Sequence, residues 1–207
     1  MYSRTRKVSF NSYVFHVWEN VYEPAEDSFL FAENLIIREG EFVLDMGTGC
    51  GILGIIAAGK AASVVAVDIN PYAVRCAHYN ARQNGLSDKM SFLQGNLFTP
   101  IKVNAKFDLI LFNAPYLPLN VPKDCDWLER AWSGGVTGRQ VIDRFISEAQ
   151  KHLKPKGSIL LMQSTLSDVD KTLQKFRKYG LDANIIARLD LPFFETLVLI
   201  EAKHKLC

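Results

Sequence analysis

Short apolar runs alternate with helical patterns along most of this chain, and this rhythm limits the folds that it can adopt. Apolar runs predict strands at residues 42–44, 64–67, 90–93, 107–112 and 159–162. Helices are predicted between or after them at residues 52–60, 71–84, 140–153 and 167–179. Two strand-like runs, 183–188 and 196–201, follow without a helix between them and should form an antiparallel hairpin. The pattern predicts an α/β fold with a doubly wound, mostly parallel sheet.

Composition excludes several classes of protein. Hydrophobic residues make up 48% of the 207 residues and charged residues 22%, which excludes an intrinsically disordered chain. A net charge of +2 does not mark a dedicated nucleic-acid binder, and no apolar run approaches the ~18 residues of a membrane span. The four cysteines form no C-x-x-C pair, so neither a zinc site nor a disulfide framework is expected. Reduced thiols indicate a cytoplasmic protein.

The division of the chain and the place of a ligand site also follow from this pattern. We expect residues 1–40 to form an N-terminal helical extension and residues 41–207 to form a single globular domain. Residues 154–157 (Lys-Pro-Lys-Gly) predict a turn before the fifth strand. In doubly wound sheets, ligands bind beyond the carboxyl ends of the strands. The residues that follow each strand are therefore the candidate site.

A glycine-rich loop follows the first predicted strand of the sheet. Its candidate ligand-binding residues are Asp45, Gly47, Thr48, Gly49 and Gly51. Glycines let a backbone turn sharply and approach a ligand closely. Gly49, Gly51 and Gly54 also match the dinucleotide pattern G-x-G-x-x-G, with Asp68 at the end of the next strand. Asp45 would repel a pyrophosphate but would suit a positively charged cofactor, and Asp68 would bind the ribose hydroxyls of either.

The fourth predicted strand ends in Asn113-Ala114-Pro115-Tyr116. With the glycine loop and Asp68, this tetrapeptide resembles the motifs of class I S-adenosylmethionine methyltransferases that modify amide or amino nitrogens. Residues 21–30 (Val-Tyr-Glu-Pro-Ala-Glu-Asp-Ser-Phe-Leu) and 131–145 (Ala-Trp-Ser-Gly-Gly to Asp-Arg-Phe) resemble the archaeal and eukaryotic HemK-like branch, which methylates the glutamine of class 1 release factors. The resemblance covers residues from about 13 to 202. It implies a Rossmann-like, seven-stranded sheet of order 3-2-1-4-5-7-6, counted from residue 42, with an antiparallel carboxyl-terminal hairpin.

The chemistry of such an acceptor gives Asn113 a defined task. An amide or exocyclic amino nitrogen is a poor nucleophile that carries two N–H donors. The side-chain oxygen of Asn113 and the carbonyl of Ala114 can accept one each, which would hold the nitrogen ~3–3.5 Å from the reacting methyl group. The same acceptors stabilise positive charge that grows on the nitrogen. Tyr116 can pack on the planar group. The alternative is that the tetrapeptide is a simple turn.

The resemblance also implies which residues bind the cofactor. They are Ser28, Asp45, Gly47, Thr48, Gly49, Gly51, Asp68, Ile69, Asn96, Leu97 and Asn113; Asn113, Ala114, Pro115 and Tyr116 form the catalytic motif. Two residues depart from the family pattern. Ala114 replaces the first proline of N-P-P-Y but keeps its carbonyl, and Asn96 replaces an aspartate, so a neutral oxygen accepts from adenine and cofactor affinity should fall. Ser28, Glu26 and Asp27 could instead be ordinary residues of a helix or its cap.

The favoured hypothesis is an S-adenosylmethionine-dependent methyltransferase that acts on the glutamine of the GGQ motif of a class 1 release factor. Three alternatives remain open at this point: an adenine N6-methyltransferase on RNA or DNA, a nicotinamide-dependent oxidoreductase, and a non-catalytic binding module. Members of the branch usually work with a small zinc-binding activator subunit, which we expect at an exposed edge strand near residues 90–93. We expect no nucleic-acid partner, no membrane and no metal bound by this chain.

Overall fold

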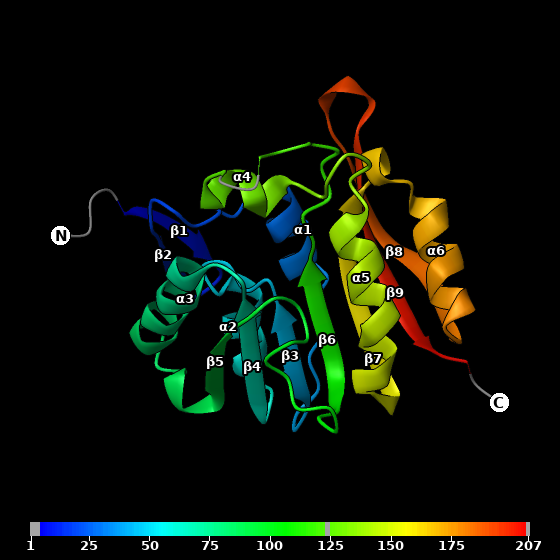
Figure 1. Ribbon diagram of the computed structural model, residues 1–207. Helices are drawn as coiled ribbons and strands as arrows, with labels where there is room; N and C mark the ends of the chain where they lie inside the picture. The colour runs from blue at the N-terminus through cyan, green and yellow to red at the C-terminus, as the bar shows by residue number, and fades with distance from the viewer. Residues whose placement is uncertain (1–4, 123–124, 206–207) are drawn as a thin grey trace. The chain divides into compact units, whose positions relative to one another are not determined.

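The computed structural model describes residues 5–122 and 125–205 (Figure 1). These residues form a two-stranded sheet and a seven-stranded sheet, and the larger sheet has the strand order β5-β4-β3-β6-β7-β9-β8. Counted from residue 42, this is the order 3-2-1-4-5-7-6, so the predicted doubly wound fold with an antiparallel hairpin is confirmed. The chain divides into two compact units, residues 1–101 and 102–207. Among the described helices, none has the length and apolar character needed to cross a membrane.

The first unit contains the glycine loop. Its described elements are, in order, β1 (Arg6–Phe10), β2 (Tyr13–Val17), α1 (Glu26–Glu33), β3 (Phe42–Met46), α2 (Ile52–Ala58), β4 (Ser63–Asp68), α3 (Pro71–Gln83), the 3₁₀ turn η1 (Ser87–Lys89) and β5 (Met90–Gln94). Strands β3, β4 and β5 are parallel, with Val43 opposite Val64 and Val64 opposite Met90. Consecutive residues of β3 are buried, as expected for a strand that is covered on both faces.

Helix α3 has the ends that its sequence predicts. Asn70 is the N-cap, and its side-chain oxygen accepts a hydrogen bond from Tyr72 N at 2.9 Å. Pro71 occupies the first turn, where its missing N–H has no cost. The helix ends before Gly85, which has φ +70° and so reverses the chain. These local signals fix where the chain leaves β4 and Asp68.

The second unit contains the tetrapeptide after β6 and the carboxyl-terminal hairpin. Its described elements are β6 (Phe107–Asn113), α4 (Trp127–Trp132), α5 (Gln140–Ala149), η2 (Gln150–His152), β7 (Leu153–Ser164), η3 (Thr165–Ser167), α6 (Val169–Lys178), β8 (Leu181–Asp190), η4 (Pro192–Phe194) and β9 (Thr196–His204). Strand β7 runs parallel to β6, and β9 is antiparallel to both β7 and β8. Helix α5 buries Phe145, whose ring centroid lies 4.6 Å from that of Phe112 on β6.

Residues 6–17 differ from the helical extension that we expected at the N-terminus. They form the antiparallel hairpin β1–β2, and α1 is the α-helix of the described residues before position 40. Asn80 of α3 and Asn84, the residue after this helix, hold β2: His16 exchanges hydrogen bonds with the Asn80 side chain at 2.8 and 2.9 Å, and Val14 does so with Asn84 at 3.1 and 2.9 Å. These side chains supply the partners that a strand requires. The division into domains 1–40 and 41–207 stays a prediction.

Residues 154–157 are the second difference, because the predicted turn lies inside β7. Leu153 pairs with Phe107, whereas the next pair joins Ser158 to Leu109, so four residues of β7 face Asp108 alone. Lys154 Nζ contacts Asp108 Oδ2 at 2.7 Å in this irregular stretch. The strand thus absorbs the proline and glycine as a bulge instead of ending at them.

Candidate active site

Asp45 shapes the glycine loop from the inside. It lies near the end of β3 and is buried. Its Oδ2 accepts hydrogen bonds from Thr48 Oγ1 at 2.6 Å and from Gly54 N at 3.0 Å. A Cβ at Gly54 would lie 2.6 Å from this oxygen, which explains the glycine at that position. The carboxylate therefore joins the loop to the first turns of α2 and contributes negative charge beneath the loop.

The loop itself leaves its backbone accessible. Gly47, Gly49 and Gly51 have φ values of +66°, +57° and +93°, a region that favours glycine. Thr48 N donates to Val67 O at 3.0 Å and fastens the loop to β4. A Cβ at Gly49 would meet no other atom within 4 Å, so the loop has open space at this point. A ligand can approach the backbone there without a side chain in its way.

Asp68 closes the other side of the loop. Its Oδ2 accepts a hydrogen bond from Gly49 N and its Oδ1 accepts one from Asn70 N, both at 2.9 Å. A carboxylate oxygen has two lone pairs, so each oxygen can still accept from a ribose hydroxyl. Ile69 follows with an exposed side chain, which provides apolar surface beside the carboxylate. The structure thus brings Asp68, Ile69 and the predicted loop residues together.

Burial changes the acidity of both carboxyl groups. Desolvation raises the pKa of Asp45 from 3.8 to about 7, against the opposing hydrogen bonds from Thr48 and Gly54. Desolvation also raises the pKa of Asp68, although backbone hydrogen bonds from Asn70 and Gly49 oppose it. A cation bound nearby would favour the ionised form of each group. The pair therefore suits a positively charged ligand better than a pyrophosphate.

The remaining predicted cofactor residues of the first unit have local partners. Ser28 is buried, and its hydroxyl donates to Asp27 Oδ1 at 3.1 Å; Tyr22 donates to the same oxygen at 2.9 Å. Asn96 N donates to Thr99 Oγ1 at 3.0 Å. Leu97 is buried with φ +52°. Contacts of Ser28, Asn96 and Leu97 with a cofactor stay predictions.

The tetrapeptide of the second unit begins where β6 ends. Asn113 pairs with Met162 of β7, and Ala114 N donates to Met162 O at 3.4 Å. The Oδ1 atom of Asn113 is buried, as is the side chain of Ala114, whereas Pro115 and Tyr116 are partly exposed. The motif therefore begins at a strand end that the sheet fixes, and it continues into a partly exposed aromatic residue.

Residues 132–139 pack behind the tetrapeptide and explain the glycines of that segment. Leu117 N donates to Trp132 O at 3.0 Å, and Gly134 N donates back to Leu117 O at 2.9 Å. A Cβ at Gly138 would lie 2.3 Å from Tyr116 O, and one at Gly134 would lie 2.4 Å from Gly138 O. Both positions lack room for any side chain. The Trp-Ser-Gly-Gly stretch thus holds the chain that leaves Tyr116.

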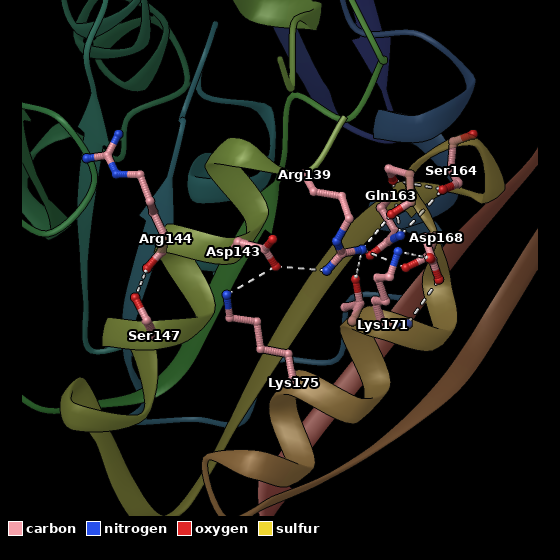
Figure 2. A network of polar contacts seen from close by, with 11 residues as sticks. Arg139, Asp143, Arg144, Ser147, Gln163, Ser164, Asp168, Lys171 and Lys175 are labelled. Atoms are coloured by element: carbon pink, nitrogen blue, oxygen red, sulfur yellow. Dashed lines mark hydrogen bonds and ion pairs between the residues drawn. The ribbon is translucent and has the colours of Figure 1, made fainter. Parts of the chain in front are cut away.

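Arg139 anchors this segment to the turn between β7 and α6. Figure 2 shows its guanidinium group reaching from the start of α5 toward that turn. The group donates to Ser167 O at 2.5 Å, to Asp168 O at 2.6 Å and to Thr172 Oγ1 at 3.0 Å. It also pairs with Asp143 at 2.9 Å, and Lys175 joins the same carboxylate at 3.2 Å. Sequence reasoning found this arginine only as part of a resemblance and gave it no task.

We expect Arg139→Ala to lower the free energy of unfolding by about 3 kcal/mol, because it removes a buried charge and leaves several acceptors without a donor. Urea denaturation of the two proteins measures the difference. Arg177→Ala removes an exposed arginine of α6 and should change the free energy by no more than about 0.5 kcal/mol. Equal stability of the Arg139 and Arg177 variants would show that the network contributes little.

Comparison with known proteins identifies the relatives of the chain. The profile of the ribosomal protein L11 methyltransferase family matches residues 28–117. A putative protein N5-glutamine methyltransferase of Methanocaldococcus jannaschii is 43% identical over 181 residues, 86% of this chain and 90% of that protein. Human methyltransferase HEMK2 is 31% identical over 176 residues, 79% of this chain and 81% of that protein.

A solved structure shares the fold. It is the complex of Mtq2 and Trm112 of E. cuniculi, described as responsible for methylation of the translation termination factor eRF1. The TM-score is 0.69 at 23% identity, and the match covers 90% of this chain and 99% of that one. Among the described residues, no group of three or more His, Cys, Asp or Glu side chains could hold a metal ion.

These relatives separate the hypotheses left open by the sequence. They support methyl transfer and not a nicotinamide-dependent reaction or a binding module. The structure agrees, because two buried or partly buried carboxyl groups flank an open glycine loop, a set that suits the positive charge of S-adenosylmethionine. The chain belongs to the HemK-like family of S-adenosylmethionine-dependent protein N5-glutamine methyltransferases.

Proposed function

We propose that this enzyme methylates the side-chain amide nitrogen of a protein glutamine, and that this glutamine is the one in the GGQ motif of a class 1 release factor. One observation carries the proposal: the chain places Asn113 and the carbonyl of Ala114 at the end of β6, backed by residues 132–139. The eRF1 methylation ascribed to the Mtq2–Trm112 complex supports the choice of substrate. Release factors act in the cytoplasm, and we assign the reaction to that compartment.

The acceptor motif would orient a nitrogen that has little nucleophilicity of its own. In the proposed complex, the glutamine amide donates one N–H to Asn113 Oδ1 and the other to the Ala114 carbonyl. The backbone that carries the Asn113 side chain and the Ala114 carbonyl is held by β7, so binding the amide requires little rearrangement of the main chain. The oxygens also stabilise the positive charge that develops on the nitrogen. Tyr116 packs against the plane of the amide.

The first unit would hold the cofactor through the glycine loop and Asp68. S-adenosylmethionine, when bound, supplies an activated methyl group on a positively charged sulfur. Asp68 accepts hydrogen bonds from the ribose hydroxyls, and Ile69 packs beside the base. Asp45 keeps the loop in shape and favours positive charge above it.

A methylation assay on an intact release factor tests the function. The enzyme, alone and with any co-purified subunit, is incubated with labelled S-adenosylmethionine and the factor. We expect one methyl group on the glutamine of the GGQ motif, located by mass spectrometry, and no label on the Gln→Ala factor. Persistent methylation of that mutant factor would overturn the choice of glutamine. Label on an adenine-containing RNA or DNA, and not on the protein, would favour the adenine methyltransferase.

Binding of S-adenosylmethionine is expected to weaken by about tenfold between pH 8 and pH 6, because the protonation of Asp45 near pH 7 removes its negative charge. The stability of the ligand-free protein should change in the opposite direction and fall as the pH rises. Folding raises the pKa of this carboxyl from 3.8 to about 7, so between these pH values it binds a proton in the native state but not in the unfolded state. Its contribution to the free energy of unfolding therefore falls as the pH rises from about 4 to 7. Calorimetric Kd values across this range check the first trend, and denaturation checks the second.

Asp45→Asn is the control for this pH dependence. Asparagine retains an acceptor for Gly54 N but does not titrate, so most of the change in Kd with pH should disappear. If the variant and the wild type gave parallel profiles, another group would be responsible.

We also propose that a small zinc-binding activator subunit binds at β5. This strand lies at the end of the sheet order, next to β4. An edge strand presents backbone groups that a second chain can pair with. The Mtq2–Trm112 complex supports a partner subunit for an enzyme of this fold. Enzyme that is monodisperse and fully active without any partner would contradict the proposal.

A further inference from the structure

We propose that the tip of the β8–β9 hairpin, residues 191–195, is a docking element for the protein substrate; this inference rests on the proposed function. The tip contains Phe193 and Phe194 in the 3₁₀ turn η4 (Pro192–Phe194). Their side chains are 96% and 102% exposed, the highest values among the exposed large hydrophobic side chains of the described residues. Figure 1 shows the hairpin extending past the end of β7.

The fold gains nothing from these two aromatic side chains. Phenylalanine is normally buried, and a fully exposed pair gives up the free energy that burial would contribute. Both residues also have φ +64°, a left-handed backbone conformation that is unfavourable for a bulky L-residue. A strained, solvent-exposed aromatic pair is therefore a feature that folding alone does not explain. A binding partner would supply the missing burial.

The base of the hairpin is firmly held, so the tip is a preformed element. Leu191 N donates to Glu195 O at 2.8 Å and closes the turn. Thr196 Oγ1 donates to Asp190 Oδ1 at 2.7 Å across the two strands. Thr196 N donates to Thr165 Oγ1 at 3.0 Å, which connects the hairpin to the end of β7. A rigid apolar projection loses little conformational entropy when it binds.

Strand register places the tip at the same edge of the sheet as the acceptor motif. Asn113 pairs with Met162 of β7, and Met162 pairs with Leu199 of β9. Phe194 precedes Leu199 on the chain, so the tip lies beyond the level of Asn113 in the direction in which β6 ends. With ~3.4 Å per residue along a strand and ~4.8 Å between strands, the separation from Asn113 is ~20 Å. All of these residues belong to the second unit.

This separation identifies the kind of occupant. A glutamine at Asn113 with its two preceding glycines spans only ~10 Å of extended chain, so the motif itself does not reach the tip. A folded domain that presents the motif on a loop does reach it. Asp190 and Glu195 lie on either side of the two phenylalanines in the sequence. The matching surface of the substrate is therefore an apolar hollow with a basic rim, about 20 Å from the methylated glutamine.

The test compares an intact release factor with a short peptide that carries the same GGQ sequence. The variant is Phe193→Ser/Phe194→Ser in the full enzyme with its co-purified subunit. We expect KM for the intact factor to rise at least tenfold, while kcat, the kinetics on the peptide and the Kd of S-adenosylhomocysteine remain unchanged. The Kd of the intact factor, measured by calorimetry with S-adenosylhomocysteine present, should weaken by the same factor. Val103→Ser, which alters another apolar side chain that is 85% exposed, is the matched control and should change none of these values.

Each contrary outcome has a distinct meaning. If wild-type enzyme methylates the factor and the double variant has the same KM and Kd, the docking assignment is overturned and the proposed function stands. An equal rise in KM for the intact factor and for the peptide also overturns the docking assignment, because the tip would then affect the acceptor site itself. If the double variant no longer retains the activator subunit, but has the wild-type KM once the complex is reassembled, the tip is a binding site for that subunit instead of for the substrate. Wild-type enzyme that neither binds nor methylates the factor overturns the proposed substrate, and the docking assignment with it.

Discussion

Replacing Asn113 with alanine is expected to lower kcat for methyl transfer by about 10²–10³-fold, while the Kd of S-adenosylhomocysteine changes by less than about threefold. Alanine removes a buried oxygen that, in the proposed complex, both positions the amide nitrogen and stabilises its developing charge. The Ala114 carbonyl remains, so some activity should persist. Single-turnover kinetics on an intact release factor, together with calorimetry of the cofactor product, measure the two effects separately.

Two variants control the Asn113 experiment. Asn113→Asp keeps an oxygen acceptor and should retain more activity than the alanine variant. Asn184→Ala removes an exposed asparagine on β8 and should have wild-type kinetics. A fall in kcat shared by Asn113→Ala and Asn184→Ala would indicate general damage to the second unit. Wild-type kcat in Asn113→Ala would remove the residue from the acceptor site.

Asp68→Ala should produce the converse result, a loss of cofactor affinity of at least about 10²-fold. Two hydrogen bonds from ribose hydroxyls to a carboxylate contribute about 1.5–3 kcal/mol each, and alanine removes both. The substitution also leaves Gly49 N and Asn70 N without their acceptor, so the glycine loop should lose order. The Kd of S-adenosylhomocysteine is the measurement. With saturating cofactor, kcat should recover most of its wild-type value.

Asp68→Asn separates the two contributions of this residue. The amide oxygen can still accept from one backbone N–H, but the charge is gone, so an intermediate Kd is expected. Asp182→Ala, at an exposed position of β8, is the matched control. If Asp68→Ala lowered kcat at saturation and left Kd unchanged, Asp68 would belong to the chemistry of the acceptor instead. The Asn113 and Asp68 variants therefore distinguish acceptor from cofactor binding.

The parts of the fold with strong local signals were predictable from the sequence. The apolar run of β6 and the proline and glycine at the ends of α3 located those elements within a few residues. The β1–β2 hairpin was missed although Tyr13–Val17 is rich in β-forming residues. The side chains that hold β2, Asn80 and Asn84, lie far along the chain and give no local signal. The turn predicted at 154–157 failed because pairing with β6 overrides the proline and glycine. Helix α4 has only six residues and gives no periodic signal.

In the candidate site, too, residues with local sequence signals were predictable and contacts between distant segments were not. Asp45, Asp68 and the loop glycines were recognised because they follow strands, and the structure joins them by hydrogen bonds. That Asp45 bonds inside the loop could not be foreseen, since it depends on the close approach of Gly54. The contacts of Arg139 with the β7–α6 turn were equally hidden, because they join residues distant in sequence. Such contacts depend on tertiary packing, which cannot be inferred from the spacing of residues in one sequence.

The packing behind Tyr116 decides where this enzyme can be redesigned. Gly134 and Gly138 have no room for a Cβ, so random changes at these two positions will yield unfolded or inactive protein. Pro118, Leu119 and Asn120, by contrast, are exposed and lie shortly after Tyr116 on the chain. A mutant library intended to admit a different amino-acid side chain as methyl acceptor should therefore randomise 118–120 and leave the inner glycines intact.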